Sequence, residues 1–197
     1  MSASLLLSMS AFALAASISP GPVNLVCLSS GTHYSLAKGL IFVTGATLGF
    51  VALFLGIGAG LYSLLESLPL LEKLLRWGGV VFLLYLSVKL ARDNGRLSQQ
   101  ASLKAPSFMT GALMQWLNPK AWIASASGIS AYTSGSDLTL IAVFALLYLP
   151  ICWLSLASWV VAGAFLKHHV QKPWLLVSIN RLLAALLAIS CVYLLLD

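Results

Sequence analysis

The chain has 197 residues, of which 60% are hydrophobic and 8% are charged. Its mean hydropathy of +0.97 lies far outside the range of soluble globular domains, so the composition excludes that class and indicates an integral membrane protein. The formal net charge of +6 does not indicate nucleic-acid binding, because the basic residues stand at the ends of hydrophobic segments and form no single basic face.

The hydrophobic segments are long enough to cross a lipid bilayer. A transmembrane helix needs about 20 apolar residues, because the hydrocarbon core is roughly 30 Å thick and a helix rises about 1.5 Å per residue. The sequence predicts about six such segments. We expect them at residues 3–30, 36–63, 70–91, 107–131, 138–166 and 173–196.

Two prolines interrupt the first segment. Pro20, Gly21 and Pro22 should unwind the helix, because proline removes a backbone donor and clashes with the preceding turn. This break leaves free carbonyl and amide groups at bilayer depth, where they are kept if they line a cavity. Gly21 would allow a close approach or an unusual backbone conformation. A broken segment could also enter and leave the membrane on one side, which would leave one full span fewer.

Polar residues follow the break in the same segment. Asn24 can offer both a donor and an acceptor to a zwitterion. His33 lies at the predicted cytoplasmic end of the segment, where an imidazole that titrates near neutral pH could relay protons. An interfacial histidine is more often simply solvated.

The second segment contains glycines at helical spacing, Gly45 with Gly49 and Gly56 with Gly60. Small residues four positions apart let helix backbones approach closely. We expect this face to pack within one protomer, and a homodimer formed through it is the alternative.

The chain divides into two halves of similar pattern. Residues 1–92 form the first predicted three-helix repeat, residues 93–106 a polar cytoplasmic linker, and residues 107–197 the second repeat. An odd number of spans in each half makes the second half enter the membrane from the opposite side, so any repeat must be inverted in topology. Apart from the prolines, the halves show no convincing alignment.

The fourth segment is also broken, at Asn118-Pro119-Lys120, about half a chain length after Pro20. Paired interruptions of this kind point to a secondary transporter with its binding site between two repeats. Asn118 either takes part in that site or caps the second half-helix.

Lys120 lies near the middle of the fourth segment, too far from either end for its side chain to reach water along the helix. A charge at the bilayer centre costs about 2.5 to 3.5 kcal/mol, so Lys120 should face a wet cavity or a partner such as a substrate carboxylate. The alternative is that Lys120 bonds carbonyls freed by the break and only holds the kink.

Basic residues define the predicted orientation. They fall in the loops after the first, third and fifth segments: Lys38; Arg92, Arg96 and Lys104; Lys167 and Lys172. By the positive-inside rule these loops face the cytoplasm, which places both termini outside. Arg181, at the start of the last segment, could reach the substrate path or the lipid headgroups.

These motifs resemble the LysE/RhtB superfamily of amino-acid exporters. The resemblance rests on Ile18 to Asn24, the second-segment glycines, Leu117 to Ala121 and Asn180-Arg181, and covers essentially the whole chain. It implies efflux of small amino acids or their derivatives across the bacterial inner membrane, coupled to the proton gradient as an antiporter. Phe50 follows Gly49 where many members carry an acid, so cysteine-like compounds, threonine or homoserine are favoured over cationic substrates.

Other function classes fit less well. A channel remains one alternative, since it would also use broken helices. A transmembrane electron carrier of the DsbD type would need a cysteine in the first and fourth segments, and Cys27 has no counterpart in residues 107–131. An enzyme is not expected, because the chain lacks His-Glu-x-x-His, a nucleophile elbow and paired intramembrane carboxylates. No cofactor or metal is expected either, since the isolated Cys27, Cys152 and Cys191 lack metal-ligand spacing.

The sequence therefore predicts an all-α membrane protein with six transmembrane helices in two inverted three-helix repeats and Pro-broken first and fourth helices. The expected partners are an amino-acid substrate, protons and the lipid bilayer. The residues expected to bind or gate the substrate are Pro20, Gly21, Pro22, Asn24, Asn118, Pro119 and Lys120, with His33 and Arg181 as candidates for a proton or substrate path.

Overall fold

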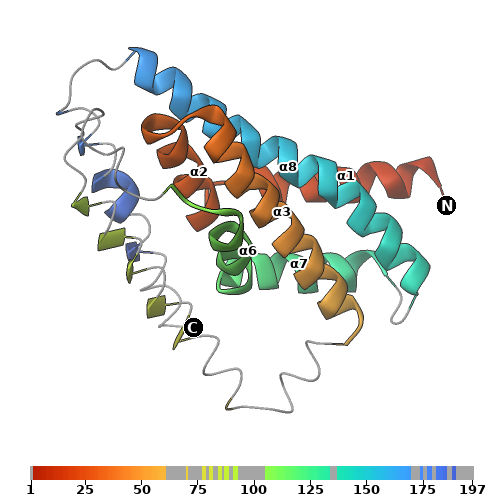
Figure 1. Ribbon diagram of the computed structural model, residues 1–197. Helices are drawn as coiled ribbons and strands as arrows, with labels where there is room; N and C mark the ends of the chain where they lie inside the picture. The colour runs from red at the N-terminus through yellow and green to blue at the C-terminus, as the bar shows by residue number, and fades with distance from the viewer. Residues whose placement is uncertain are drawn as a thin grey trace.

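The computed structural model describes residues 2–60, 105–133 and 137–169, together with isolated positions between 70 and 92 and between 174 and 189. All regular structure in these ranges is helical. The helices are α1 (Ala3–Ile18), α2 (Pro22–His33), α3 (Leu36–Gly58), α6 (Phe108–Trp116), α7 (Pro119–Tyr132) and α8 (Leu138–His169). Figure 1 shows the long helices α3 and α8 side by side, with α1 crossing behind α8 and with α6 and α7 packed beside α3.

Both predicted breaks are confirmed. α1 ends at Ile18 and α2 starts at Pro22, and the two helices meet at an angle of 61°. α6 ends at Trp116 and α7 starts at Pro119. Proline is tolerated at the first helical position, since its missing N–H would have no intrahelical partner there.

Within the described residues, helices of membrane length stand at two of the predicted spans. α3 and residues Leu138–Leu166 of α8 are long and apolar enough to cross a bilayer, and α1 with α2 meets the same test as a bent pair. α6 and α7 contain 9 and 14 residues, so neither spans alone. The third and sixth predicted segments lie largely outside the described residues, as does most of the linker, and the six-span arrangement stays a prediction.

α3 runs antiparallel to α8 along nearly its whole length. Near the start of α3, Gly39 packs on Val160 in the last third of α8, and at the end of α3, Gly58 packs on Ile141 near the start of α8. Aromatic rings fill the interface between them. Phe50 and Phe54 of α3 contact Tyr148 of α8, with ring centroids 4.6 Å and 5.4 Å apart.

The bent pair α1–α2 follows α8 from one end towards the other. Phe12 of α1 contacts Phe144 in the first half of α8, and Gly31 of α2 packs on Gly163 near its end. The chain therefore keeps its direction across the break. This course favours a single broken span over a segment that turns back.

Of the second-segment glycines, Gly45 and Gly49 pack within the protomer, as expected, whereas a Cβ atom at Gly60 would meet nothing within 4 Å. A side chain at Gly45 would collide with the backbone oxygen of Phe108, and one at Gly49 would lie 2.6 Å from the Cα atom of Ala112. Both contacts are made to α6. The face that carries Gly45 and Gly49 is thus occupied by the protein itself.

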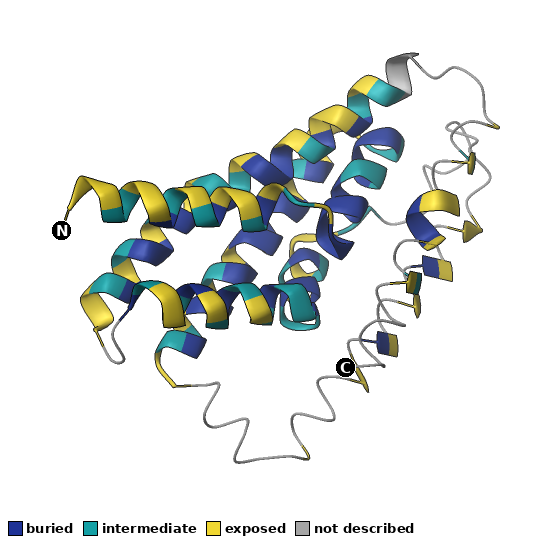
Figure 2. Cartoon of the chain, turned by 180° about the vertical axis from the view of Figure 1, so that it is seen from behind, coloured by how far each residue is buried: buried dark blue, intermediate teal, exposed yellow. Residues whose placement is uncertain are grey.

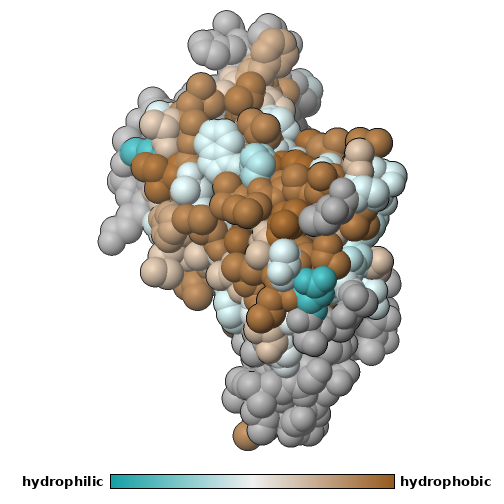
Figure 3. All heavy atoms as spheres, turned by 90° about the vertical axis from the view of Figure 1, so that its right-hand side faces the viewer, coloured by the Kyte–Doolittle hydropathy of each residue, from teal (hydrophilic) through white to brown (hydrophobic). Residues whose placement is uncertain are grey.

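The outward faces of the helices are hydrophobic. Figure 3 shows large apolar side chains over most of one face. On α8, Leu146 is 70% exposed and Phe165 is 63% exposed. By contrast, most residues of α2 are buried, and Figure 2 shows buried residues along the inner faces of the bundle. An exposed apolar surface around a packed interior suits a lipid environment.

Candidate functional site

The two helix breaks lie side by side in the centre of the structure. The ammonium group of Lys120, at the start of α7, donates to the backbone oxygen of Ser19 at 2.6 Å and to that of Pro20 at 3.4 Å. Both oxygens belong to the break between α1 and α2. Of the two interpretations of Lys120, the structure shows contact with freed carbonyls, and the carbonyls come from the break in the other half.

The carbonyl groups at the end of α1 are each bonded by a side chain from a different helix. Asn24 of α2 donates to Ser17 O at 2.9 Å, and Trp159 of α8 donates to Ile18 O at 3.1 Å. Lys120 of α7 donates to the next carbonyl along the chain. Because an unpaired carbonyl is costly in a nonaqueous interior, these bonds stabilise the break.

Asn118 caps α7. Its Oδ1 atom accepts from the backbone N–H of Lys120 at 3.2 Å, which satisfies one of the donors at the helix start. The capping interpretation is therefore confirmed. The same side chain is 4% exposed and lines a cavity, so its position also suits a role in binding.

Gly21 provides room for the lysine side chain. A Cβ atom at this position would lie 2.9 Å from Lys120 Cδ and 3.1 Å from its Nζ. The backbone of Gly21 is extended, with φ −165° and ψ 174°, a conformation open to any residue. Close approach, and not an unusual backbone conformation, explains the glycine.

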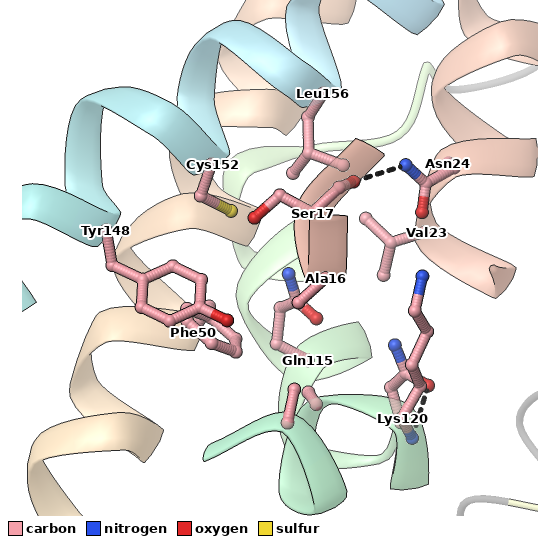
Figure 4. Close-up of a pocket in the computed structure, with 13 residues that line it drawn as sticks. Ala16, Ser17, Val23, Asn24, Phe50, Gln115, Lys120, Tyr148, Cys152 and Leu156 are labelled. Carbon is pink, nitrogen blue, oxygen red and sulfur yellow. Dashed lines mark hydrogen bonds between the residues drawn. The ribbon is translucent and has the colours of Figure 1, made fainter. Parts of the chain in front are cut away.

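A small cavity of about 30 Å³ lies between the breaks and α8 (Figure 4). Every helix described here contributes to its wall or abuts it. The lining residues are Ala16, Ser17, Val23, Asn24, Phe50, Gln115, Asn118, Lys120, Ala121, Ala124, Tyr148, Cys152 and Leu156. This volume holds one or a few water molecules, so an amino acid does not fit in the cavity, and we refer to this conformation as the closed state.

The structure brings together three of the predicted polar residues. Asn24, Asn118 and Lys120 line the cavity, and the predicted prolines Pro20, Pro22 and Pro119 form the breaks beside it. Their use by a substrate stays a prediction.

The candidates for a proton or substrate path lie elsewhere. His33 is the last residue of α2, and its Nδ1 atom lies 2.8 Å from Ser29 O. Arg181 is exposed. Neither residue lines the cavity.

Sequence reasoning missed several cavity residues on α6 and α8. Gln115 is a buried amide within an apolar stretch, three positions before Asn118. Tyr148 and Cys152 flank Pro150, a proline inside α8. Proline inside a helix frees the carbonyl four residues earlier. Pro150 and the polar residue Gln115 in an apolar stretch could therefore have indicated these cavity residues from the sequence.

Comparison with known proteins extends these observations. The family model described as "LysE type translocator" matches residues 14–197. A protein of Klebsiella pneumoniae named "Cysteine/O-acetylserine efflux protein" is 28% identical over 186 residues, which cover 92% of each chain. Its namesake in Salmonella typhimurium is 26% identical over 189 residues, again 92% of each chain.

A third relative has a different printed substrate. A "Leucine efflux protein" of an Enterobacter species is 24% identical over 182 residues, which cover 87% of this chain and 85% of the relative. No solved structure matches the chain. The family model covers nearly the whole chain, including both helix breaks and the cavity between them, and the protein therefore belongs to the LysE type translocator family.

Proposed function

We propose that this protein exports small neutral or zwitterionic amino acids, or their derivatives, from the cytoplasm. The export direction is supported by the relatives, which are named efflux proteins for cysteine and O-acetylserine or for leucine. The observation that carries the proposal for the site is Lys120, held between two helix breaks at the wall of a central cavity.

Lys120 is suited to bind the carboxylate of an amino acid. Lys120 belongs to the first turn of α7, and its ammonium group lies beside Gly21 at the start of α2, where unpaired backbone N–H groups also favour a negative charge. In the closed state the ammonium group donates hydrogen bonds to Ser19 O and Pro20 O. A zwitterion can replace both partners at once, because its carboxylate takes the place of the carbonyls at Lys120 and its ammonium group takes the place of Lys120 at the carbonyls.

The charges of the cavity favour a neutral side chain on the substrate. Lys120 is the one charged residue among the described residues that line the cavity. A cationic side chain would have to enter without a countercharge, which is costly away from water. This agrees with the substrates in the relatives' names, all of which have uncharged side chains.

The helix contacts support an inverted repeat. If α1, α2 and α3 are matched to α6, α7 and α8, each main contact between the described helices of the two halves has a counterpart. α1 packs on α8 as α6 packs on α3, α2 packs on α8 as α7 packs on α3, and α1 packs on α7 as α6 packs on α2. Such a pair of repeats can move one against the other around a central site, which is the basis of alternating access.

To test the proposal, cells that overproduce the protein are fed dipeptides, and the amino acids that accumulate in the medium are measured. We expect one or a few amino acids to accumulate outside with the wild type and at least about tenfold less with Lys120→Ala, since a charged hydrogen bond is lost. Lys38→Ala is the control, because Lys38 is exposed at the start of α3. Coupling to protons predicts that a protonophore abolishes the accumulation.

The outcomes separate the parts of the proposal. Equal accumulation with wild type and Lys120→Ala at equal membrane abundance would keep the exporter and remove Lys120 from its mechanism. No accumulation with the wild type would contradict export.

A further inference from the structure

Tyr148 has a feature that packing does not explain. The residue is 1% exposed, and its hydroxyl oxygen has no hydrogen-bond partner within the described part of the chain. A buried hydroxyl without a partner costs free energy that a phenylalanine at the same place would not. The hydroxyl therefore suits a partner that is not present in the closed state.

The ring of Tyr148 is held firmly by other aromatic side chains. Its centroid lies 4.6 Å from that of Phe50, 5.4 Å from Phe54 and 5.3 Å from Phe144. Phe50 and Tyr148 both line the cavity. Because the ring is fixed on three sides, its hydroxyl has a defined position.

The hydroxyl points into the cavity from the side opposite Lys120. Figure 4 shows Tyr148 directed towards the space between Cys152 and Gln115, with Lys120 across the cavity. The cavity thus has a cationic end at the helix breaks and a second end with a hydroxyl set in an aromatic wall. An amino acid bound by its carboxylate at Lys120 would direct its side chain towards Tyr148.

We propose that Tyr148 is a specificity-determining residue, whose hydroxyl bonds a polar group on the substrate's side chain. The inference rests on the proposed function. Amino acids whose side chain carries an acyl carbonyl, a hydroxyl or a thiol satisfy the tyrosine hydroxyl, which can donate or accept. An aliphatic side chain of similar size leaves that hydroxyl unpaired. A site built to form a hydrogen bond rejects a ligand that lacks the bonding group more strongly than an apolar pocket rejects a ligand that differs by one methylene group.

Purified protein in liposomes tests the inference with O-acetylserine and leucine as the two probes. We expect wild type to prefer O-acetylserine, and Tyr148→Phe to raise the KM for O-acetylserine about tenfold while the KM for leucine stays the same or falls. Tyr132→Phe is the matched control, since the Tyr132 hydroxyl bonds Ser8 and lies outside the cavity lining.

The experiment distinguishes the inference from the function on which it rests. Two results would overturn the role of Tyr148 and leave the exporter in place. One is the same substrate preference in wild type and Tyr148→Phe, and the other is a wild type that prefers leucine. Transport of neither probe by the wild type, with no accumulation in the cellular assay, would overturn both.

Discussion

At the scale of single residues, the proposed site depends on how the charge of Lys120 is satisfied inside an apolar bundle. Lys120 is bonded to backbone oxygens at Ser19 and Pro20, and no carboxylate lines the cavity among the described residues. Carbonyl groups solvate an ammonium ion without neutralising it. A substrate carboxylate at the proposed site would therefore still meet a net positive charge, which a lysine already paired with an acid would not offer.

Gly21 gives a test of this arrangement that leaves the fold intact. In Gly21→Ala the new methyl group would press on the Lys120 side chain, a flexible neighbour that can move away. We expect the stability of the protein to change by about 1 kcal/mol or less, while export falls several-fold because Lys120 loses its position. Thermal unfolding in detergent and the accumulation assay measure the two effects.

Gly78→Ala is the matched control for this substitution. A Cβ atom there would lie 3.8 Å from Leu117 Cδ2, which is ordinary contact. Unchanged export in Gly21→Ala would show that the position of Lys120 beside the break is not needed for transport.

At the scale of helices, close packing holds the broken elements in place. α6 has only 9 residues, and its backbone lies directly against Gly45 and Gly49 of α3. Helices associate in lipid through such small residues, because the hydrophobic effect does not drive them together there. The long helix α3 thus positions the short helix that leads into the second break.

Gly45→Ala tests whether this contact lies within the protomer. The added methyl group would meet the backbone oxygen of Phe108, so α6 must move, and we expect a loss of about 1–3 kcal/mol in thermal unfolding experiments. Ala52→Val, at an exposed position of α3, should have little effect. Loss of a dimer in Gly45→Ala, with a protomer of unchanged stability, would instead favour the homodimer interpretation.

The sequence predicted the helix breaks and the unusual lysine, because proline and an intramembrane charge each have strong local consequences. It did not predict that Lys120 bonds Ser19 O, since a backbone oxygen carries no signature in the sequence and the partners are about half a chain apart. Tyr148 was missed because an aromatic residue in an apolar helix resembles a core residue until its hydroxyl is found unpaired. His33 was predicted from an imidazole at the end of a segment and Arg181 from its position at the start of the last segment, and neither lines the cavity.

At the scale of the whole molecule, the two breaks meet near the centre of the proposed repeats. The bond between Lys120 and Ser19 joins α7 of one half to the end of α1 in the other. A substrate that takes over both groups removes this link between the halves. Substrate binding and the relative movement of the halves would then be coupled through the same atoms.

The proposed topology places the ends of the helices on defined sides of the membrane. Ser8 of α1 bonds Tyr132 at the end of α7, which puts the start of α1 near the start of α8. Because α3 is antiparallel to α8, the turn before Lys38 lies at the opposite end. Ser2 and Asp137 should therefore face outside, and Lys38 should face the cytoplasm.

Cysteine labelling tests this prediction in spheroplasts with a membrane-impermeant thiol reagent. The three native cysteines are replaced by alanine, and Ser2→Cys, Lys38→Cys and Asp137→Cys are introduced singly, each at an exposed position. We expect labelling of Ser2→Cys and Asp137→Cys in intact spheroplasts, and labelling of Lys38→Cys only after lysis. Labelling of Ser2→Cys only after lysis would place both ends of α1–α2 on one side and contradict a broken span. Since an inverted repeat requires α1–α2 to cross, that result would also remove the pairing of the halves on which alternating access around Lys120 depends.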